Sequence, residues 1–242
     1  MVYQPRTYRQ WIRSPDLVTF SVVMEETDLL VSAGSDLSSQ ALEIVQRLRL
    51  ALKDYIGKHP SFVSTLEPML VEDDAPSLVR DMALAARAAG VGPMAAVAGA
   101  IAEAVGTRLL GYSDEVIVEN GGDIFLKSSR RRLVGIYAGE SRLTGKIAFQ
   151  IEPEDTPLGV CTSSGTVGHS LSFGLADAAT VFSSSTALAD AAATAIGNLI
   201  RSAGDIPKAI EFARQVPQLR GVAIVKGDVL GLWGDVRIAS LV

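Results

Sequence analysis

Residues 115–126, Glu-Val-Ile-Val-Glu-Asn-Gly-Gly-Asp-Ile-Phe-Leu, carry the clearest fold signal in this chain. Two short apolar runs flank the tetrad Asn120-Gly121-Gly122-Asp123. Asn and Gly tolerate the positive φ angles that a tight hairpin turn requires. The stretch therefore predicts two antiparallel strands joined at the glycine pair.

Similar strand patterns lie toward both ends of the chain. Residues 18–22 and 29–31 flank a polar turn, and residues 222–225 and 229–233 flank Gly227-Asp228. Runs of β-branched residues separated by such turns predict a hairpin at each end. Further strands are expected over residues 133–137, 147–151, 159–161 and 178–182.

Helical periodicity fills the segments between these strands. The expected helices cover residues 37–57, 76–89, 93–110, 187–203 and 207–215. Helices grouped between strands, rather than alternating with single strands, predict an α+β fold with antiparallel sheets and helices packed on one side. Because no linker, internal repeat or low-complexity tract interrupts the chain, we expect a single domain over residues 1–242.

Composition excludes several classes of protein. The 242 residues are 48% apolar, which excludes a disordered chain. Cys161 is the only cysteine, which excludes a disulfide framework and multi-cysteine zinc modules, and two histidines are too few for a histidine-rich metal site. A net charge of −5 lacks the basic surplus typical of nucleic-acid-binding proteins, so we expect no nucleic-acid partner.

The N-terminal residues do not have the pattern of an export signal. Residues 1–16 are polar and arginine-rich, without the apolar run of a signal peptide. The low-charge stretch 88–102 is too short to span a bilayer. We therefore expect a cytoplasmic protein without a membrane partner.

The turn Asn120-Gly121-Gly122-Asp123 also has a chemical interpretation. Adjacent glycines expose backbone N–H groups, and such nests bind phosphates or other anions. The alternative is a plain hairpin turn in which Asp123 acts as a cap.

Residues 161–170, Cys-Thr-Ser-Ser-Gly-Thr-Val-Gly-His-Ser, concentrate hydroxyl groups, glycines and a histidine. Such hydroxyls and loop N–H groups are suited to holding a phosphate, with His169 as a donor or proton shuttle. The candidate phosphate-binding residues are Thr162, Ser163, Ser164 and Gly165. Two other interpretations concern Cys161, which forms either a nucleophilic dyad with His169 or a small part of the core.

Residues 189–198, Ala-Asp-Ala-Ala-Ala-Thr-Ala-Ile-Gly-Asn, begin an expected helix in which Asp190 and Thr194 share a face. A carboxylate and a hydroxyl suit Mg²⁺, a hard cation that keeps waters and shares substrate phosphates. The alternative is that Asp190 caps its own helix and Thr194 bonds a preceding carbonyl. The helix expected over residues 93–110 is rich in Ala and Gly, which allow the close approach of either another backbone or a ligand.

These segments, taken in order, resemble the signature of the ApbE-like superfamily, which has Gly-Gly-Asp, a Thr-Ser-Gly segment with a downstream His, and Asp-x-x-x-Thr. The resemblance covers residues 90–198. The best-known members are FAD:protein FMN transferases, which cleave FAD with Mg²⁺ and attach FMN to a Thr or Ser of a target protein. The longer segments around these motifs are similar to an uncharacterised prokaryotic family that is related to these transferases.

The resemblance implies an ApbE-like α+β fold and a Mg²⁺-dependent transferase or hydrolase that acts on a flavin or nucleotide pyrophosphate. It implies that Asp190 and Thr194 hold the metal with a backbone carbonyl near Ala96, and that His169 orients or protonates the substrate. The implied partners are a phosphate-bearing small molecule, such as FAD or FMN, and a protein acceptor.

The sequence also departs from the transferase signature. Residues 93–98, Pro-Met-Ala-Ala-Val-Ala, stand where the transferases have Lys-Gly-Tyr-Ala-x-Asp, so this Lys and Asp are missing. Residues 170–174 are shorter than the transferases' Ile-x-Asp-Pro-x-Thr-Gly run and lack its Asp and Pro. These departures leave a non-catalytic flavin- or nucleotide-binding relative as the alternative to an enzyme.

Overall fold

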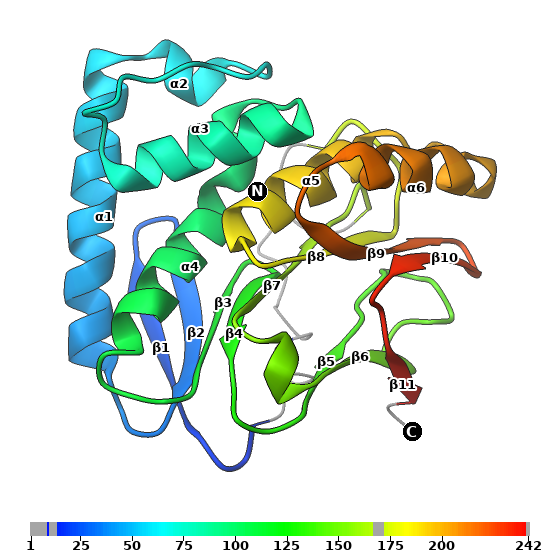
Figure 1. The fold of residues 1–242 in the computed structure, drawn as a ribbon, viewed down its shortest axis with the longest axis horizontal. Coiled ribbons are helices and arrows are strands. Elements are labelled where there is room, and N and C mark those ends of the chain that lie inside the picture. Colours follow the sequence, from blue (N-terminus) through cyan, green and yellow to red (C-terminus); the bar gives the residue numbers. More distant parts are fainter. Residues whose placement is uncertain (1–8, 10–13, 167–171, 241–242) are drawn as a thin grey trace.

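The computed structural model describes residues 9, 14–166 and 172–240 (Figure 1). An eight-stranded antiparallel sheet has the order β1-β2-β3-β4-β7-β8-β9-β10, and a three-stranded sheet has the order β11-β6-β5. The large sheet contains β1 (Val18–Met24), β2 (Thr27–Ala33), β3 (Val116–Asn120), β4 (Asp123–Lys127), β7 (Leu158–Ser163), β8 (Ala178–Ser183), β9 (Leu219–Lys226) and β10 (Val229–Gly234). The small sheet contains β5 (Arg132–Gly135), β6 (Ile147–Ile151) and β11 (Ile238–Ser240).

The helices gather on one face of the large sheet, and the small sheet covers part of the other face (Figure 1). The helices are α1 (Ser38–Lys58), α2 (Ser61–Ser64), α3 (Ser77–Ala89), α4 (Val97–Leu109), α5 (Thr186–Asn198) and α6 (Ile206–Gln215). Side chains that alternate along each strand therefore enter two different cores. On β4, Phe125 packs into the core under the helices, whereas Ile124 and Leu126 pack toward the small sheet.

The two halves of the large sheet have the same order of elements. β1 and β2 precede α1–α4, and β3 and β4 follow; β7 and β8 precede α5 and α6, and β9 and β10 follow. In each half the chain returns from the helices to pair antiparallel with the strand it left. This order recurs although the sequence shows no internal repeat, and it places α4 and α5 together above the central strands.

The predicted α+β class is confirmed, including helices on one side of an antiparallel sheet. The strands expected over residues 133–137 and 147–151 occur as β5 and β6, and with β11 they form the separate sheet whose apolar side chains cover the back of the large sheet. One expectation differs from the structure. α5 ends at Asn198, before residue 203, because the Asp205 carboxylate accepts the N–H groups of Arg201 and Ser202 and begins a new turn.

Among the described residues no single helix is long and apolar enough to cross a membrane. The pair formed by residues 77–89 and 93–109 has sufficient length and apolar composition only when both parts are taken together, and it is bent by 104°.

A buried ion network joins the N-terminal segment to both sheets. Arg132 of β5 is 5% exposed and pairs with Asp16 at 2.6 Å and with Glu115 at 2.8 Å. The hydrogen bond from Arg132 holds the pKa of Asp16 at about 2. Burial raises the pKa of Glu115, but hydrogen bonds from Ser128, Ser129 and Arg132 outweigh it and hold that pKa at about 2 as well.

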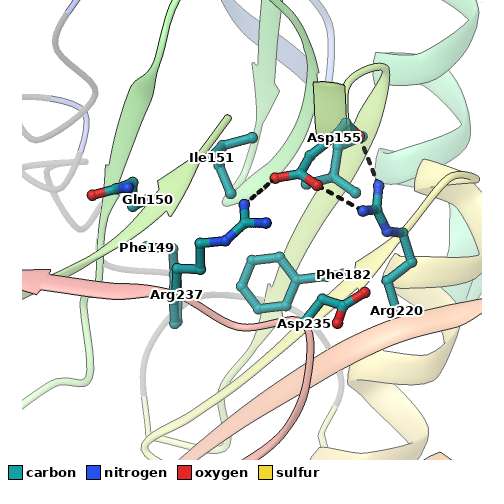
Figure 2. Close-up of a pocket in the computed structure, with 9 residues that line it drawn as sticks. Phe149, Gln150, Ile151, Asp155, Phe182, Arg220, Asp235 and Arg237 are labelled. Carbon is teal, nitrogen blue, oxygen red and sulfur yellow. Dashed lines mark hydrogen bonds and ion pairs between the residues drawn. The ribbon is translucent and has the colours of Figure 1, made fainter. Parts of the chain in front are cut away.

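A second ion network links the large sheet to the small sheet. Asp155 accepts from Arg220 of β9 at 2.8 Å and from Arg237, just before β11, at 2.5 Å (Figure 2). The space beside these side chains is about 10 Å³, room for about one water molecule. Two guanidinium groups share one carboxylate there, and this arrangement fixes the C-terminal strand to the large sheet.

The start of α5 lies directly on β7. A Cβ atom at Gly159 would lie 2.5 Å from the Cα of Thr186, a separation that a folded chain does not accommodate without moving the helix. Glycine at position 159 therefore allows the backbones of β7 and α5 to touch.

We predict that Gly159→Ala lowers the free energy of unfolding by about 1–3 kcal/mol, because the new methyl group overlaps backbone atoms. Gly57→Ala is the control, since a Cβ there meets nothing within 4 Å and the residue lies inside α1. That change should raise stability by about 0.5–1 kcal/mol. Urea unfolding of both variants makes the comparison, and a neutral Gly159→Ala would contradict the contact.

We also predict that the Arg132 network makes the protein acid-labile. The pKa values of Asp16 and Glu115 fall from ordinary values of 3.8 and 4.5 to about 2, so the unfolded chain binds protons in this range that the folded chain does not. Their contribution is therefore complete above pH 4.5 and is lost as the pH falls toward 2. Urea unfolding measured from pH 7 downward should show this loss.

Arg132→Met should cost about 3–5 kcal/mol at neutral pH, because it leaves Glu115 without its cation and Asp16 with only Arg130, at 3.5 Å. It should also flatten the acid limb of the stability profile. Arg47→Met, which breaks an exposed pair with Glu43 on α1, should change stability by less than about 0.5 kcal/mol. Identical acid profiles for wild type and Arg132→Met would exclude the network as the cause.

Candidate functional site

The candidate site lies where the N-termini of α4 and α5 meet above β3, β4 and β7. The two helices approach closely at Gly99, where a Cβ atom would lie 2.4 Å from the carbonyl oxygen of Thr186. The small residues expected over 93–110 thus serve backbone packing at this point. The first turns of both helices carry N–H groups without partners inside their own helix.

Each of these helices caps the other. Asp190 of α5 accepts a hydrogen bond through Oδ2 from the backbone N–H of Gly99, in the first turn of α4, at 2.8 Å. Glu103 of α4 accepts through Oε2 from the N–H of Ala187 at 3.1 Å and from the hydroxyl of Ser185 at 3.3 Å. The two carboxylates therefore lie at the positive ends of two helix dipoles.

The alternative that Asp190 caps its own helix is wrong. The cap of α5 is Ser185, whose Oγ accepts from the N–H of Leu188 at 3.3 Å. Asp190 is too far along α5 for that role, and its carboxylate points across to α4 instead. The related idea for Thr194 also fails, since no hydrogen bond from Thr194 to a preceding carbonyl occurs among the described residues.

Asn120 and Asp123 form the floor of the site. They face each other across the turn between β3 and β4 and lie on the helix side of the sheet. The amide Nδ2 of Asn120 donates to the carbonyl oxygen of Ala98 at 3.0 Å. That carbonyl belongs to the peptide unit whose N–H bonds Asp190, so a strand and a helix hold one peptide of α4 from two sides.

Asp123 is 7% exposed, and its Oδ1 atom is buried without a hydrogen-bond partner. Burial, followed by repulsion from Asp190, raises its pKa well above the ordinary value of 3.8. Burial likewise raises the pKa of Asp190 to about 7, although the N–H groups of Gly99 and Ala98 oppose this rise. A buried carboxylate, Asp123, thus lies near a half-buried one, Asp190.

Cys161 lies beside this pair and is fully buried. Burial and the two aspartates raise the pKa of its thiol well above the usual value, and its Sγ donates to the carbonyl of Thr186 at 3.4 Å. A buried, protonated thiol is a poor nucleophile. The structure therefore favours the interpretation of Cys161 as a core residue over the dyad with His169.

The expected phosphate-binding segment is divided by the alternation of β7. The hydroxyl of Thr162 bonds that of Thr180 at 2.9 Å, on the face away from the helices. Ser163 points toward α5, with Oγ 3.5 Å from the position of a Cβ at Gly197. Ser164 bonds locally with Thr166, and the N–H of Gly165 donates to the carbonyl of Ala176 at 2.9 Å. His169 lies outside the described residues.

The glycine pair adopts the expected turn. Gly121 and Gly122 have φ angles of 69° and 105°, conformations that favour glycine. The N–H of Gly122 donates to Glu119 at 2.8 Å, so this donor serves the turn itself. Glu119, 1% exposed, is paired with Arg9 at 2.6 Å.

Thr194 and Ala96 border the same region. Thr194 lies one turn beyond Asp190 and is half-buried. Ala96 ends the 3₁₀ turn Pro93–Ala96, which packs against α5, and its side chain is buried.

Two residues of this region were missed from sequence. Thr186 has a fully buried Oγ1 atom without a partner, one turn before Asp190. Thr186, Asp190 and Thr194 follow one another at four-residue spacing, which places them along one face of a helix. This signal could have been detected in the sequence. Glu103 has no comparable signal, because its role depends on the crossing of two helices.

The described residues contain no group of three or more His, Cys, Asp or Glu side chains arranged to hold a metal ion. A divalent cation here would instead combine two carboxylates with hydroxyl, backbone and phosphate oxygens, as Mg²⁺ does. The unpartnered Oδ1 of Asp123, close enough to Asp190 to be repelled by it, fits such a cation, because this oxygen has no donor or cation of its own.

Comparisons with known proteins place this chain among ApbE relatives. The family model described as "AbpE bacteria" matches residues 9–227. The UPF0280 protein MJ1526 of Methanocaldococcus jannaschii is 44% identical over 221 residues, covering 89% of this chain and 90% of its own. The UPF0280 protein of Methanothermobacter thermautotrophicus is 46% identical over 199 residues, covering 80% and 76%.

Solved structures show the same fold at low sequence identity. The apo flavinyl transferase ApbE of Pseudomonas stutzeri is 12% identical, with a TM-score of 0.54 and coverage of 90% of this chain and 94% of its own. A mutant of the flavin transferase ApbE of Vibrio cholerae is 14% identical, with a TM-score of 0.58 and coverage of 90% and 96%. The chain therefore belongs to the AbpE bacteria family and has the fold of the ApbE flavin transferases.

Proposed function

We propose that this protein binds Mg²⁺ together with a phosphate-bearing small molecule, a flavin or nucleotide pyrophosphate, at the Asp190 site and transfers or hydrolyses it. The observation that carries this proposal is the buried, unpartnered Oδ1 of Asp123 beside the Asp190 carboxylate. Keeping the buried Asp123 carboxylate beside the half-buried Asp190 carboxylate is costly unless a cation or a proton offsets their charge. A bound divalent cation would remove that penalty.

Asp190 and Thr194 would hold the cation from α5, with Asp123 opposite and a carbonyl near Ala96 alongside. When bound, Mg²⁺ supplies charge stabilisation at phosphate oxygens. The N-termini of α4 and α5 add a favourable potential for an anionic ligand. Ser163, on the helix side of β7, would orient a phosphate, while Asn120 holds the first turn of α4.

A flavin is the first ligand to test. The solved structures with this fold include proteins described as flavin transferases, at 12% and 14% identity. A protein acceptor and a proton-donating role for His169 belong to the same proposal. The absence of the transferase Lys and Asp from residues 93–98 favours a second candidate, a flavin- or nucleotide-binding relative without catalysis.

We predict that Mg²⁺ with FAD or ADP raises the melting temperature of the wild-type protein, since a ligand of the folded state stabilises it by mass action. Asp190→Asn and Thr194→Val should each reduce this shift. Asp190→Asn keeps an oxygen that accepts from Gly99 and removes one repelling charge, so the ligand-free fold should remain intact. Thermal-shift titration of Mg²⁺ measures the effect.

Asp54→Asn, on the exposed side of α1, is the matched control and should respond like the wild type. Equal Mg²⁺ shifts for wild type and Asp190→Asn across these ligands would remove Asp190 from the proposal. Incubation with FAD then distinguishes the enzyme from the non-catalytic relative. Chromatography measures the AMP and FMN that are released. Binding without turnover favours the non-catalytic relative, whereas Mg²⁺-dependent turnover that is lost in Asp190→Asn supports the enzyme.

A further inference from the structure

The turn that joins β3 to β4 is bonded from the back face of the large sheet. Glu119 is buried, and its Oε1 accepts from the backbone N–H of Gly122 at 2.8 Å. Because neighbouring residues of a strand point to opposite faces, Glu119 lies on the face away from Asn120 and the helices. Ile117, on the same face as Glu119, packs toward the small sheet. A carboxylate on the back face therefore bonds the turn that carries Asn120 and Asp123.

Side-chain packing contributes little to this turn. Gly121 and Gly122 have no side chain, and a Cβ at Gly121 would meet nothing within 4 Å. A Cβ at Gly122 would lie 3.8 Å from the carbonyl oxygen of Thr162, an ordinary contact distance. Two adjacent glycines have wide conformational freedom unless hydrogen bonds restrict them. The bond to Glu119, together with the pairing of β3 with β4, therefore fixes the turn.

Arg9 bonds the other oxygen of the Glu119 carboxylate. Its Nε donates to Oε2 of Glu119 at 2.6 Å. Its Nη1 donates to Oδ1 of Asp28 at 3.1 Å, and its Nη2 donates to the carbonyl oxygen of Asp28 at 2.8 Å. These three bonds fix the planar guanidinium group in one orientation, which the point charge of a lysine cannot reproduce. The side chain of Arg9 is 17% exposed, so its ion pair with Glu119 is partly shielded from water and salt.

The position of Glu119 depends on the charge of Arg9. Holding an ionised carboxylate away from water is costly, and a guanidinium group in contact with it offsets that cost. Without Arg9, the Glu119 carboxylate would lower its free energy by turning toward water. That movement would release the N–H of Gly122 and loosen the turn, and Asp123 would lose its fixed position.

The charge of Arg9 by itself acts in the opposite direction. Burial and Asp190 are the larger causes of the raised pKa of Asp123, and repulsion from Glu119 adds to them, so Glu119 lies within electrostatic reach of the site. An arginine paired with Glu119 reduces the attraction of this region for a cation. Loss of Arg9 would therefore strengthen cation binding if charge alone mattered and weaken it if positioning dominates.

We propose that Arg9 is a positioning residue of the candidate cation site: through Glu119 it holds the Gly121-Gly122 turn, and thereby Asp123, in the conformation that binds a divalent cation. The inference rests on the proposed function, because it concerns the cation of that same site. Arg9 acts through Glu119 and does not touch the cation. A residue near the N-terminus thus supports a site through a contact with a residue 110 positions away in the chain.

The test measures binding of Mn²⁺ to the whole protein, alone and with FAD or ADP. Mn²⁺ binds the same kinds of oxygen ligand as Mg²⁺, and the relaxation of water protons detects it on the protein. Arg9→Met should weaken Mn²⁺ binding by about tenfold, the lower end of the effects typical of residues that orient metal ligands. Asp28→Ala is the matched control, because Arg9 keeps its bonds to Glu119 and to the carbonyl of residue 28. The control should bind Mn²⁺ like the wild type.

A double variant, Arg9→Met with Glu119→Gln, tests whether the effect passes through Glu119. The glutamine amide is neutral, so it does not need a guanidinium group to stay buried, and its oxygen can still accept from the N–H of Gly122. Mn²⁺ affinity should therefore return toward the wild-type value, although the double variant carries one more substitution. Circular dichroism confirms that each variant is folded.

Unchanged or tighter Mn²⁺ binding by Arg9→Met overturns the positioning role. Equal weakening by Asp28→Ala also overturns it, because the effect would then come from the general attachment of the N-terminal segment. A double variant that binds as weakly as Arg9→Met excludes Glu119 as the link. A wild-type protein that binds no Mn²⁺ under any of these conditions overturns the proposed function itself, and this inference with it.

Discussion

Reciprocal capping of α4 and α5 is the interaction on which the candidate site depends. The N-terminal N–H groups of two helices meet above the central strands, and each helix supplies one carboxylate to the other. Buried N–H groups without acceptors would destabilise the fold, so these two acids stabilise it even when no ligand is bound. The close approach requires Gly99 and Gly159, which both touch Thr186 at the start of α5.

This arrangement gives the acids of the region different environments. Glu103 of α4 caps α5 by accepting from the N–H of Ala187 and the hydroxyl of Ser185. Asp190 caps α4 while facing Asp123, whose Oδ1 has no partner of its own. Structural hydrogen bonds hold Asp190 in place, so a cation would meet a preorganised carboxylate rather than a mobile one. Replacing Asp190 with Asn should therefore leave the fold intact, because the amide oxygen still accepts from Gly99. The same replacement removes the negative charge that would bind a cation.

The burial of both faces of the large sheet decides which strand residues reach the site. Helices cover one face and the small sheet covers part of the other, so alternate residues of a single strand enter different environments. Alternation sends Ser163 toward α5 and Thr162 toward Thr180, although both belong to one polar run. A run of hydroxyls in the sequence therefore does not form one surface in the fold.

The sequence by itself determined the hairpin at Gly121-Gly122, the end of α3 at residue 89, the α+β class and the family resemblance. These features depend on local φ preferences, residue periodicity and short motifs, all of which are encoded within a few residues. Tertiary structure alone decided that Asp190 caps α4 rather than α5, that Glu103 caps α5, and that β5, β6 and β11 leave the large sheet. These outcomes arise because hydrogen-bond acceptors and buried faces are shared between segments up to 91 residues apart, and such partners have no signature in local sequence.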